Sequence, residues 1–160
     1  MDYTAHRLAY CDFLISSQIN YTQTYLADHS ERYSHDSLNR FLRFDRLTPK
    51  VLWENVRADV VLSKNGYLLF DDMVLDKRHS RKSRLVRKQW SGNEKRVIYG
   101  IGVVTCVNVN PELNQFWIIN YRIYDPQGDE QTKIEHMIEM LDNVLTSKKL
   151  PFRTVLMDSW

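Results

Sequence analysis

The sequence has few cysteines, no long apolar run and little excess of charge of either sign. Its two cysteines, Cys11 and Cys106, stand in no motif spacing. This argues against a disulfide framework and a cysteine metal site, so a reduced, cytoplasmic protein is the simplest interpretation. The longest mostly apolar run, residues 97–107, is too short to span a bilayer. The N-terminal residues also lack the charged and apolar regions of a signal peptide, so no membrane partner is expected.

Internal repeats and low-complexity linkers are also absent, and the five histidines show no metal-ligand spacing. A chain of 160 residues fits one domain, or one domain with a small helical part attached to it. The hydrophobic periodicity changes from residue 66, which sets the expected domain boundary near residues 62–66. We therefore predict a helical region over residues 1–62 and a sheet-containing domain over residues 63–160.

The net charge of +2 hides an uneven distribution. Residues 77–96 contain nine lysines and arginines and one acid, which leaves 13 bases and 19 acids elsewhere. A basic segment on an otherwise acidic chain favours a polyanion partner over a merely solvated loop. We predict that this segment is a loop or extended hairpin that grips DNA backbone, with Trp90 either stacking on a base or fixing the loop. The predicted contacts are Lys77, Arg78, Arg81, Lys82, Arg84, Arg87 and Lys88.

In the first part of the chain, the apolar spacing predicts helices over residues 4–15, 22–29, 34–44 and 48–60. Ser34 is a suitable N-cap, and Pro49 suits the first position of a helix. The second and third helices, joined by a short turn, resemble a helix-turn-helix. The exposed face of the third helix would carry Asn39, Arg40 and Arg43, which can read base edges. The alternative is a plain helical bundle whose solvated face carries these residues.

The second part of the chain predicts strands over residues 67–72, 96–108, 115–124 and 153–157, with a helix over 132–145. That helix would place Ile134, Ile138, Leu141 and Leu145 on one apolar stripe. Three strands with short links favour an antiparallel meander. The crossover helix then allows the fourth strand to lie parallel to an earlier one. The predicted fold class is therefore α+β or α/β.

Carboxylates follow two of these apolar strands, which is unusual because a buried carboxylate is costly unless it is paired or binds a metal. Asp71 and Asp72 end the strand at 67–72, and Asp158 follows the last strand. If the two strands are parallel neighbours, Asp72 and Asp158 lie close enough to share a metal ion. Two such carboxylates suit Mg²⁺, and a pair of these ions can support phosphodiester cleavage. The alternative is that each Asp begins a turn or caps a helix.

Three stretches of this sequence carry a resemblance to a known family: Tyr-Leu-Leu-Phe-Asp-Asp at 67–72, Lys77, and Val-Leu-Met-Asp-Ser-Trp at 155–160. Together they resemble the N-terminal part of a bacterial insertion-sequence transposase of the DDE superfamily. The resemblance implies a helical DNA-binding region followed by a partial RNase H-like catalytic domain. It implies that Asp72 and Asp158 are catalytic metal ligands for two Mg²⁺ or Mn²⁺ ions. It also implies transposon-end DNA as partner, homo-oligomer formation by the complete enzyme, and a place at the nucleoid.

The sequence departs from the family pattern at two points. Met73 stands where the family usually has Thr, which keeps Asp71 as the second choice for the first metal ligand. The family's catalytic Glu lies on a later helix, and no Glu of this chain can be assigned that role. A truncated, inactive transposase is therefore expected. A DNA-binding regulator of its own element, without catalysis, is the main alternative, and a structural α+β protein without a nucleic-acid partner is the third.

Overall fold

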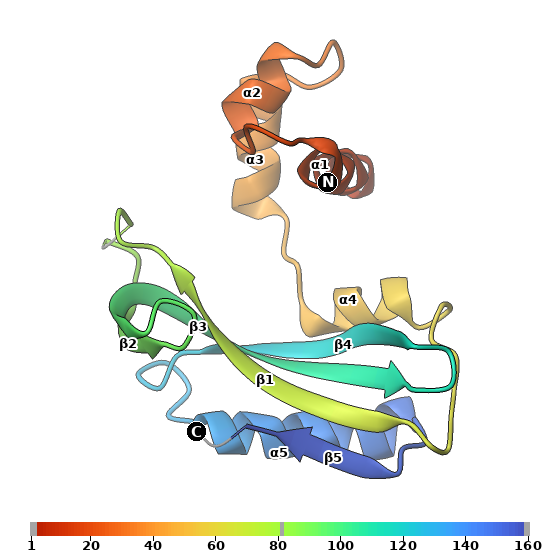
Figure 1. Ribbon diagram of the computed structural model, residues 1–160. Coiled ribbons are helices and arrows are strands. Elements are labelled where there is room, and N and C mark those ends of the chain that lie inside the picture. The colour runs from red at the N-terminus through yellow and green to blue at the C-terminus, as the bar shows by residue number, and fades with distance from the viewer. Residues whose placement is uncertain (1–2, 81, 159–160) are drawn as a thin grey trace. The chain divides into compact units, whose positions relative to one another are not determined.

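The computed structural model describes residues 3–80 and 82–158 (Figure 1). It divides into two compact units, Met1–Leu47 and Thr48–Trp160. This division precedes the boundary expected from the sequence near residues 62–66. The reason is that α4 (Pro49–Val56) packs against β4 (Gln115–Tyr124) and so belongs to the sheet unit. None of the described helices is long and apolar enough to cross a membrane.

The first unit contains three helices: α1 (Thr4–Ser16), α2 (Gln23–Asp28) and α3 (His35–Phe44). The side chains of Thr22 and Ser34 cap α2 and α3, because each accepts a hydrogen bond from a backbone N–H of the first turn. Leu38 and Phe41 of α3 are buried, as the apolar spacing predicts. Arg7 of α1 forms two hydrogen bonds to Asp45 just after α3, which holds the first and last helices together.

The second unit contains a mixed five-stranded sheet. Its strands are β1 (Tyr67–Asp76), β2 (Arg87–Ser91), β3 (Arg96–Asn110), β4 (Gln115–Tyr124) and β5 (Thr154–Met157). The strand order is β2-β3-β1-β5, and β4 also pairs with β3. β1, β2 and β4 run antiparallel to β3, whereas β5 runs parallel to β1. The mixed α and β class, the helical N-terminal region and the parallel last strand are therefore confirmed.

The first strand is longer than the sequence predicts. β1 continues through Asp76, so Asp71 and Asp72 lie inside the strand and not at its end. The cause is β3, whose 15 residues provide pairing partners along the whole of β1. Because successive side chains of a strand point to opposite faces, the two neighbouring carboxylates cannot occupy the same face of the sheet.

The helix after β4 turns a different side to the core from the one expected. α5 (Lys133–Asn143) continues into a π-helical turn, Val144–Lys148, and Figure 1 shows it running alongside β5. His136, Met140 and Val144 are buried, whereas the predicted stripe of Ile134, Ile138 and Leu145 is exposed and only Leu141 packs against the core. Both stripes satisfy helical spacing. Helical spacing alone therefore does not specify which side of α5 faces the sheet, and the packing of the folded chain decides it.

Candidate functional site

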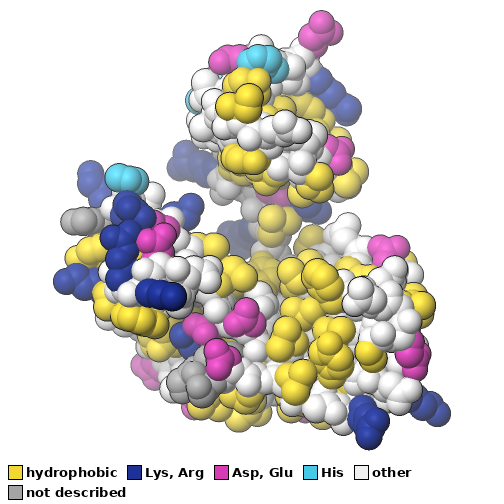
Figure 2. All heavy atoms as spheres, in the orientation of Figure 1, with side chains coloured by type: hydrophobic (Ala, Val, Ile, Leu, Met, Phe, Trp, Pro, Cys, Tyr) yellow, Lys and Arg dark blue, Asp and Glu magenta, His cyan; other side chains and the backbone are white. Residues whose placement is uncertain are grey.

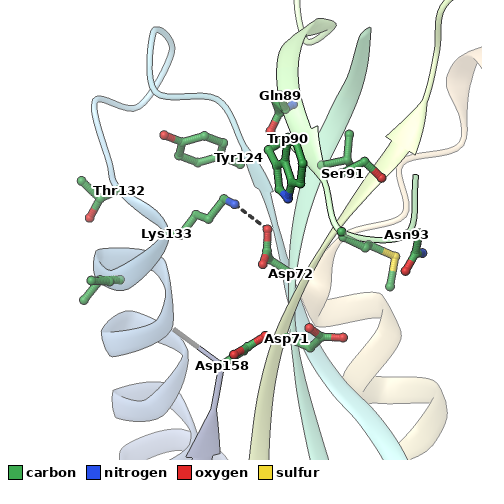
Figure 3. A pocket seen from close by; sticks show the side chains of 14 residues that line it. Asp71, Asp72, Gln89, Trp90, Ser91, Asn93, Tyr124, Thr132, Lys133 and Asp158 are labelled. Atoms are coloured by element: carbon green, nitrogen blue, oxygen red, sulfur yellow. Dashed lines mark hydrogen bonds and ion pairs between the residues drawn. The ribbon is translucent and has the colours of Figure 1, made fainter. Parts of the chain in front are cut away.

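A cavity of about 870 Å³ lies where β5 ends beside β1, just beyond their last paired residues (Figure 3). Residues from five separate segments line it, so only the tertiary fold assembles it. They include Asp71 and Asp72 of β1, Trp90 of β2, Tyr124 of β4, Lys133 of α5 and Asp158 after β5. The cavity therefore holds all three predicted carboxylates, the tryptophan of the basic segment, and a lysine that the sequence did not single out.

The parallel pairing of β1 and β5 determines which carboxylates are level with each other. Phe70 pairs with Met157, so Asp158, the next residue of the chain, comes level with Asp71. Figure 3 shows the carboxyl groups of Asp71 and Asp158 at the same height on their two segments, with Asp72 one step further along β1. The register sets Asp71 level with Asp158, whereas Figure 3 shows their carboxyl groups on opposite sides of β1, so both Asp71 and Asp72 remain candidates for the first metal ligand.

Asp72 has a partner of a different kind. It occupies the face of β1 on which Leu68 and Phe70 are buried, and its Oδ2 forms an ion pair with Nζ of Lys133 (Figure 3). Both side chains are largely shielded, with exposed fractions of 21% for Asp72 and 25% for Lys133. An ammonium group thus lies against one carboxylate oxygen of Asp72 in this structure. The two neighbouring aspartates face different surroundings, although in the sequence they look equivalent.

The fit of a divalent metal ion to this site depends on the donors available. Carboxylate oxygens are the ligands that Mg²⁺ prefers, and Mg²⁺ is often held by one or two carboxylates together with waters and phosphate. Asp71 and Asp158 supply two such groups. No third His, Cys, Asp or Glu among residues 3–80 and 82–158 completes a group that could hold a metal ion without other ligands. The site suits a weakly held ion that a phosphate helps to bind.

The basic segment forms a hairpin, because β2 pairs with the start of β3. Several of its arginines are engaged in ion pairs. Arg84 and Arg87 both contact Asp125, the buried residue after β4, at 3.1 Å and 2.6 Å. Arg78 forms an ion pair with Asp76, and its hydrogen bonds lower the pKa of that carboxyl to about 2. Of these arginines, Arg87 is the shielded one, with an exposed fraction of 20%, and it ties β2 to the residue after β4, whereas Arg84 stays 75% exposed.

Four lysines of this segment have no carboxylate partner in the described part of the chain: Lys77, Lys82, Lys88 and Lys95. All four are exposed, and Nζ of Lys88 lies 5.6 Å from the ring centroid of Tyr99. We call these residues the lysine set. Lys77, Lys82 and Lys88 belong to the predicted DNA contacts, whereas Lys95 does not. Arg81, another predicted contact, lies outside the described residues.

The helical unit also gathers its predicted DNA contacts. Asn39, Arg40 and Arg43 line one hollow on α3, together with Asp36 and Phe44. All five side chains are exposed, and the guanidinium of Arg43 lies 5.3 Å from the ring centroid of Phe44. The face is therefore polar, with two arginines and an asparagine side by side, which suits contact with base edges and phosphates.

Sequence reasoning missed Lys133 and Asp125, although one signal could have found the lysine. β4 runs parallel to β1, because both pair antiparallel with β3. The helix that follows β4 must therefore start at the same end of the sheet where the carboxylates lie. The topology of the predicted strands would have placed the first turn of this helix, and Lys133 within it, beside Asp71 and Asp72. Asp125 gives no such signal, because its arginine partners lie 38 and 41 positions away along the chain.

Comparison with known proteins adds no further assignment. No protein-family model matches the chain, and no curated protein matches it either. The functional assignment therefore rests on the residues and their geometry.

Proposed function

We propose that this chain is a DNA-binding protein of the DDE transposase type, whose sheet edge holds a divalent metal ion beside bound DNA. The observation that carries the proposal is the parallel pairing of β1 with β5, which brings Asp71 level with Asp158 inside one cavity. Within the lysine set, Lys88 lies on β2 two positions before Trp90, and Trp90 lines this cavity. Clustered carboxylates beside a basic surface are the arrangement that metal-dependent phosphodiester chemistry needs.

The order of the elements supports an RNase H-like domain. Apart from the hairpin strand β2, the sheet unit has three antiparallel strands, then a helix, then a strand parallel to the first. This is the order that the resemblance to DDE transposases implies. Transposon-end DNA as partner, oligomer formation and a place at the nucleoid belong to the same proposal.

The roles of the residues follow from their surroundings. Asp71 and Asp158 would hold Mg²⁺ or Mn²⁺, which when bound would polarise a phosphodiester and lower the pKa of a bound water. The lysine set would neutralise DNA phosphates, and the exposed Trp90 would stack on a base. Asn39, Arg40 and Arg43 would give the helical unit a separate DNA contact.

A titration with Mn²⁺, followed by electron paramagnetic resonance, tests the metal site in the whole chain. Asp71→Asn and Asp158→Asn should each weaken Mn²⁺ binding in the presence of DNA by about tenfold or more, because each removes one of two charged ligands. Asp59→Asn is the matched control, since Asp59 is exposed and does not line this cavity. Equal Mn²⁺ binding by all four proteins would refute the proposed site.

A regulator that binds DNA without catalysis is the second candidate. It is favoured by one observation, namely that no third metal-ligating side chain completes the site among the described residues. In that case Asp71→Asn and Asp158→Asn would leave DNA affinity unchanged, and Mg²⁺ would have no effect on it. A DNA-binding titration with and without Mg²⁺ distinguishes the two candidates.

A further inference from the structure

A buried carboxylate follows β4 and does not line the cavity described above. Asp125 is only 7% exposed. Its Oδ1 accepts a hydrogen bond from Nη2 of Arg87 on β2 at 2.6 Å, and its Oδ2 lies 3.1 Å from Nη2 of Arg84. A buried carboxylate is costly unless it is paired, so the folded chain favours keeping this contact. The contact therefore ties β2 to the segment that follows β4.

The turn after β4 is built closely around this carboxylate. The backbone N–H of Gly128 donates a hydrogen bond to the carbonyl oxygen of Asp125 at 2.7 Å. A Cβ at position 128 would collide with Oδ2 of Asp125 and would lie 3.1 Å from Nη1 of Arg84. Glycine allows this close approach because it has no side chain. The turn therefore determines where the carboxylate lies.

The two faces of β2 have different surroundings, because successive side chains of a strand alternate between its faces. Arg87, Gln89 and Ser91 share one face. Gln89 donates a hydrogen bond to a backbone carbonyl of β3 at 3.0 Å, and Ser91 is buried. Lys88 and Trp90 occupy the opposite face and are exposed, and Trp90 lines the cavity (Figure 3). Contacts on one face of β2 thus direct the other face outward.

We propose that Asp125 is a positioning residue for DNA binding, because through Arg87 it fixes β2 so that Lys88 and Trp90 face the bound DNA. This inference rests on the proposed function for DNA as the ligand. It makes Arg87 an anchor of the hairpin and not a phosphate contact, in agreement with the 20% exposed fraction of its side chain. Asp125 acts through Arg87 and does not itself contact DNA.

The sign of one effect separates this role from the others. Asp125→Asn removes a negative charge beside a basic surface and releases Arg87. If Arg87 binds phosphate, the change increases DNA affinity. If Asp125 positions β2, the change lowers affinity, because Lys88 and Trp90 lose their fixed placement. If the ion pair only supports the fold, the change lowers stability and leaves the affinity of the folded protein unaltered.

The experiment measures binding of a fluorescent DNA duplex by anisotropy, over a range of salt concentrations, in EDTA so that the metal site does not contribute. Asp125→Asn should weaken binding roughly fivefold at low salt, because a loosened hairpin must be ordered when DNA binds. Arg87→Gln should have a similar effect. The double variant should lose no more than either single variant, since the two residues act as a unit.

Asp129→Asn is the matched control, because it makes the same charge change in the same turn. The carboxylate of Asp129 lies 3.4 Å from Nε2 of His136 and forms no ion pair with Arg84 or Arg87. This variant should alter DNA affinity by less than about twofold.

Gly128→Ala provides a second variant that changes no charge. Its added Cβ would displace the carboxylate of Asp125, so it should weaken DNA binding by a similar factor. Hydrogen exchange of the backbone amides reports the position of the hairpin directly. Protection of β2 should fall in Asp125→Asn and Gly128→Ala, whereas protection where β3 pairs with β1 should be retained. Thermal unfolding identifies a variant that fails to fold, and if this is Asp125→Asn, Gly128→Ala and Arg87→Gln carry the test.

The inference is overturned if Asp125→Asn binds DNA as tightly as Asp129→Asn does, or if the protection of β2 stays unchanged. Its failure can be distinguished from the failure of the metal site. Normal Mn²⁺ binding without the Asp125 effects overturns this inference alone. The Asp125 effects without Mn²⁺ binding overturn the metal site alone. A wild-type chain that does not bind DNA in EDTA at any salt concentration overturns this inference together with the proposed DNA partner.

Discussion

The two units of this protein are built on different principles. The sheet unit has a buried cluster that draws on β1, β3, β4 and α5, and it includes Leu68, Phe70, Val104 and Met140. The helical unit buries Tyr33, Leu38 and Phe41, and otherwise relies on contacts between aromatic rings and on one ion pair. On the face of the sheet unit that Figure 2 shows, Lys and Arg side chains gather at the left, and a broad apolar area lies to the right of them. The carboxylates and Lys133 therefore lie on or beside elements that pack on a buried core. The predicted base-reading residues lie on α3, which buries only Leu38 and Phe41.

The largest expected effect is on the core of the sheet unit. Phe70→Ala removes a fully buried ring and should reduce the free energy of unfolding by about 3–5 kcal/mol. Leu38→Ala is the counterpart in the helical unit, where we expect about 2–5 kcal/mol. NMR spectra of the backbone amides recorded during thermal unfolding should show that each substitution lowers the unfolding temperature of its own unit only. Simultaneous unfolding of both units in either variant would contradict the comparison.

The next effect concerns DNA affinity, and it tests which unit supplies most of the binding. Replacing the four residues of the lysine set by Glu should weaken binding by roughly two orders of magnitude at low salt, because these side chains would no longer neutralise phosphates. Arg40→Ala should reduce the binding free energy by about 1–3 kcal/mol, and only for a preferred DNA sequence. Competition binding with sequences of different composition measures both. If Arg40→Ala weakens binding equally for every DNA sequence, α3 contacts only phosphates.

A smaller effect concerns the ion pair that closes the helical unit. Arg7 donates two hydrogen bonds to Asp45, at 3.0 Å and 2.8 Å. Arg7→Met should lower the stability of this unit by about 1.5–3 kcal/mol, since the hydrogen bonds involve charged groups that are partly shielded. Chemical denaturation followed by circular dichroism measures the change. The sheet unit should unfold at the same denaturant concentration as before, which serves as the internal control.

The smallest effect concerns the exposed pair of Asp76 and Arg78 at the end of β1. The hydrogen bonds from Arg78 depress the folded-state pKa of Asp76 from 3.8 to about 2. A depressed pKa gives a contribution to stability that is present above pH 4 and is lost as the pH falls through 2. Carbon NMR of the carboxyl group should therefore show a titration near pH 2, which returns toward pH 4 in Arg78→Ala. An unshifted titration in the wild-type protein would mean that the pair is broken in solution.

Local signals in the sequence are sufficient for most elements and for some of the site. Ser34 and Pro49 mark helix starts because capping and the fixed φ of proline act within a few residues. The strands at 96–108 and 115–124 show the β-branched composition and the alternation that a sheet requires. Asp158 directly follows a strand, as predicted, and the parallel pairing of that strand with the first one follows from the crossover helix.

The remaining features depend on partners that are distant in the sequence. β1 passes through Asp71 and Asp72 because β3 is long enough to pair with it. α4 joins the sheet unit because β4 offers it a surface, and α5 turns His136 and Met140 inward although its apolar spacing suits another face.

The amino-acid sequence is thus enough to specify the elements, their order and the residue types at the candidate site. The partner of each aspartate there emerges only from the folded chain. The strand register sets Asp158 level with Asp71, and the packing of α5 brings Lys133 into an ion pair with Asp72. Capping and periodicity act between near neighbours in the chain, whereas register and pairing depend on which distant segments meet.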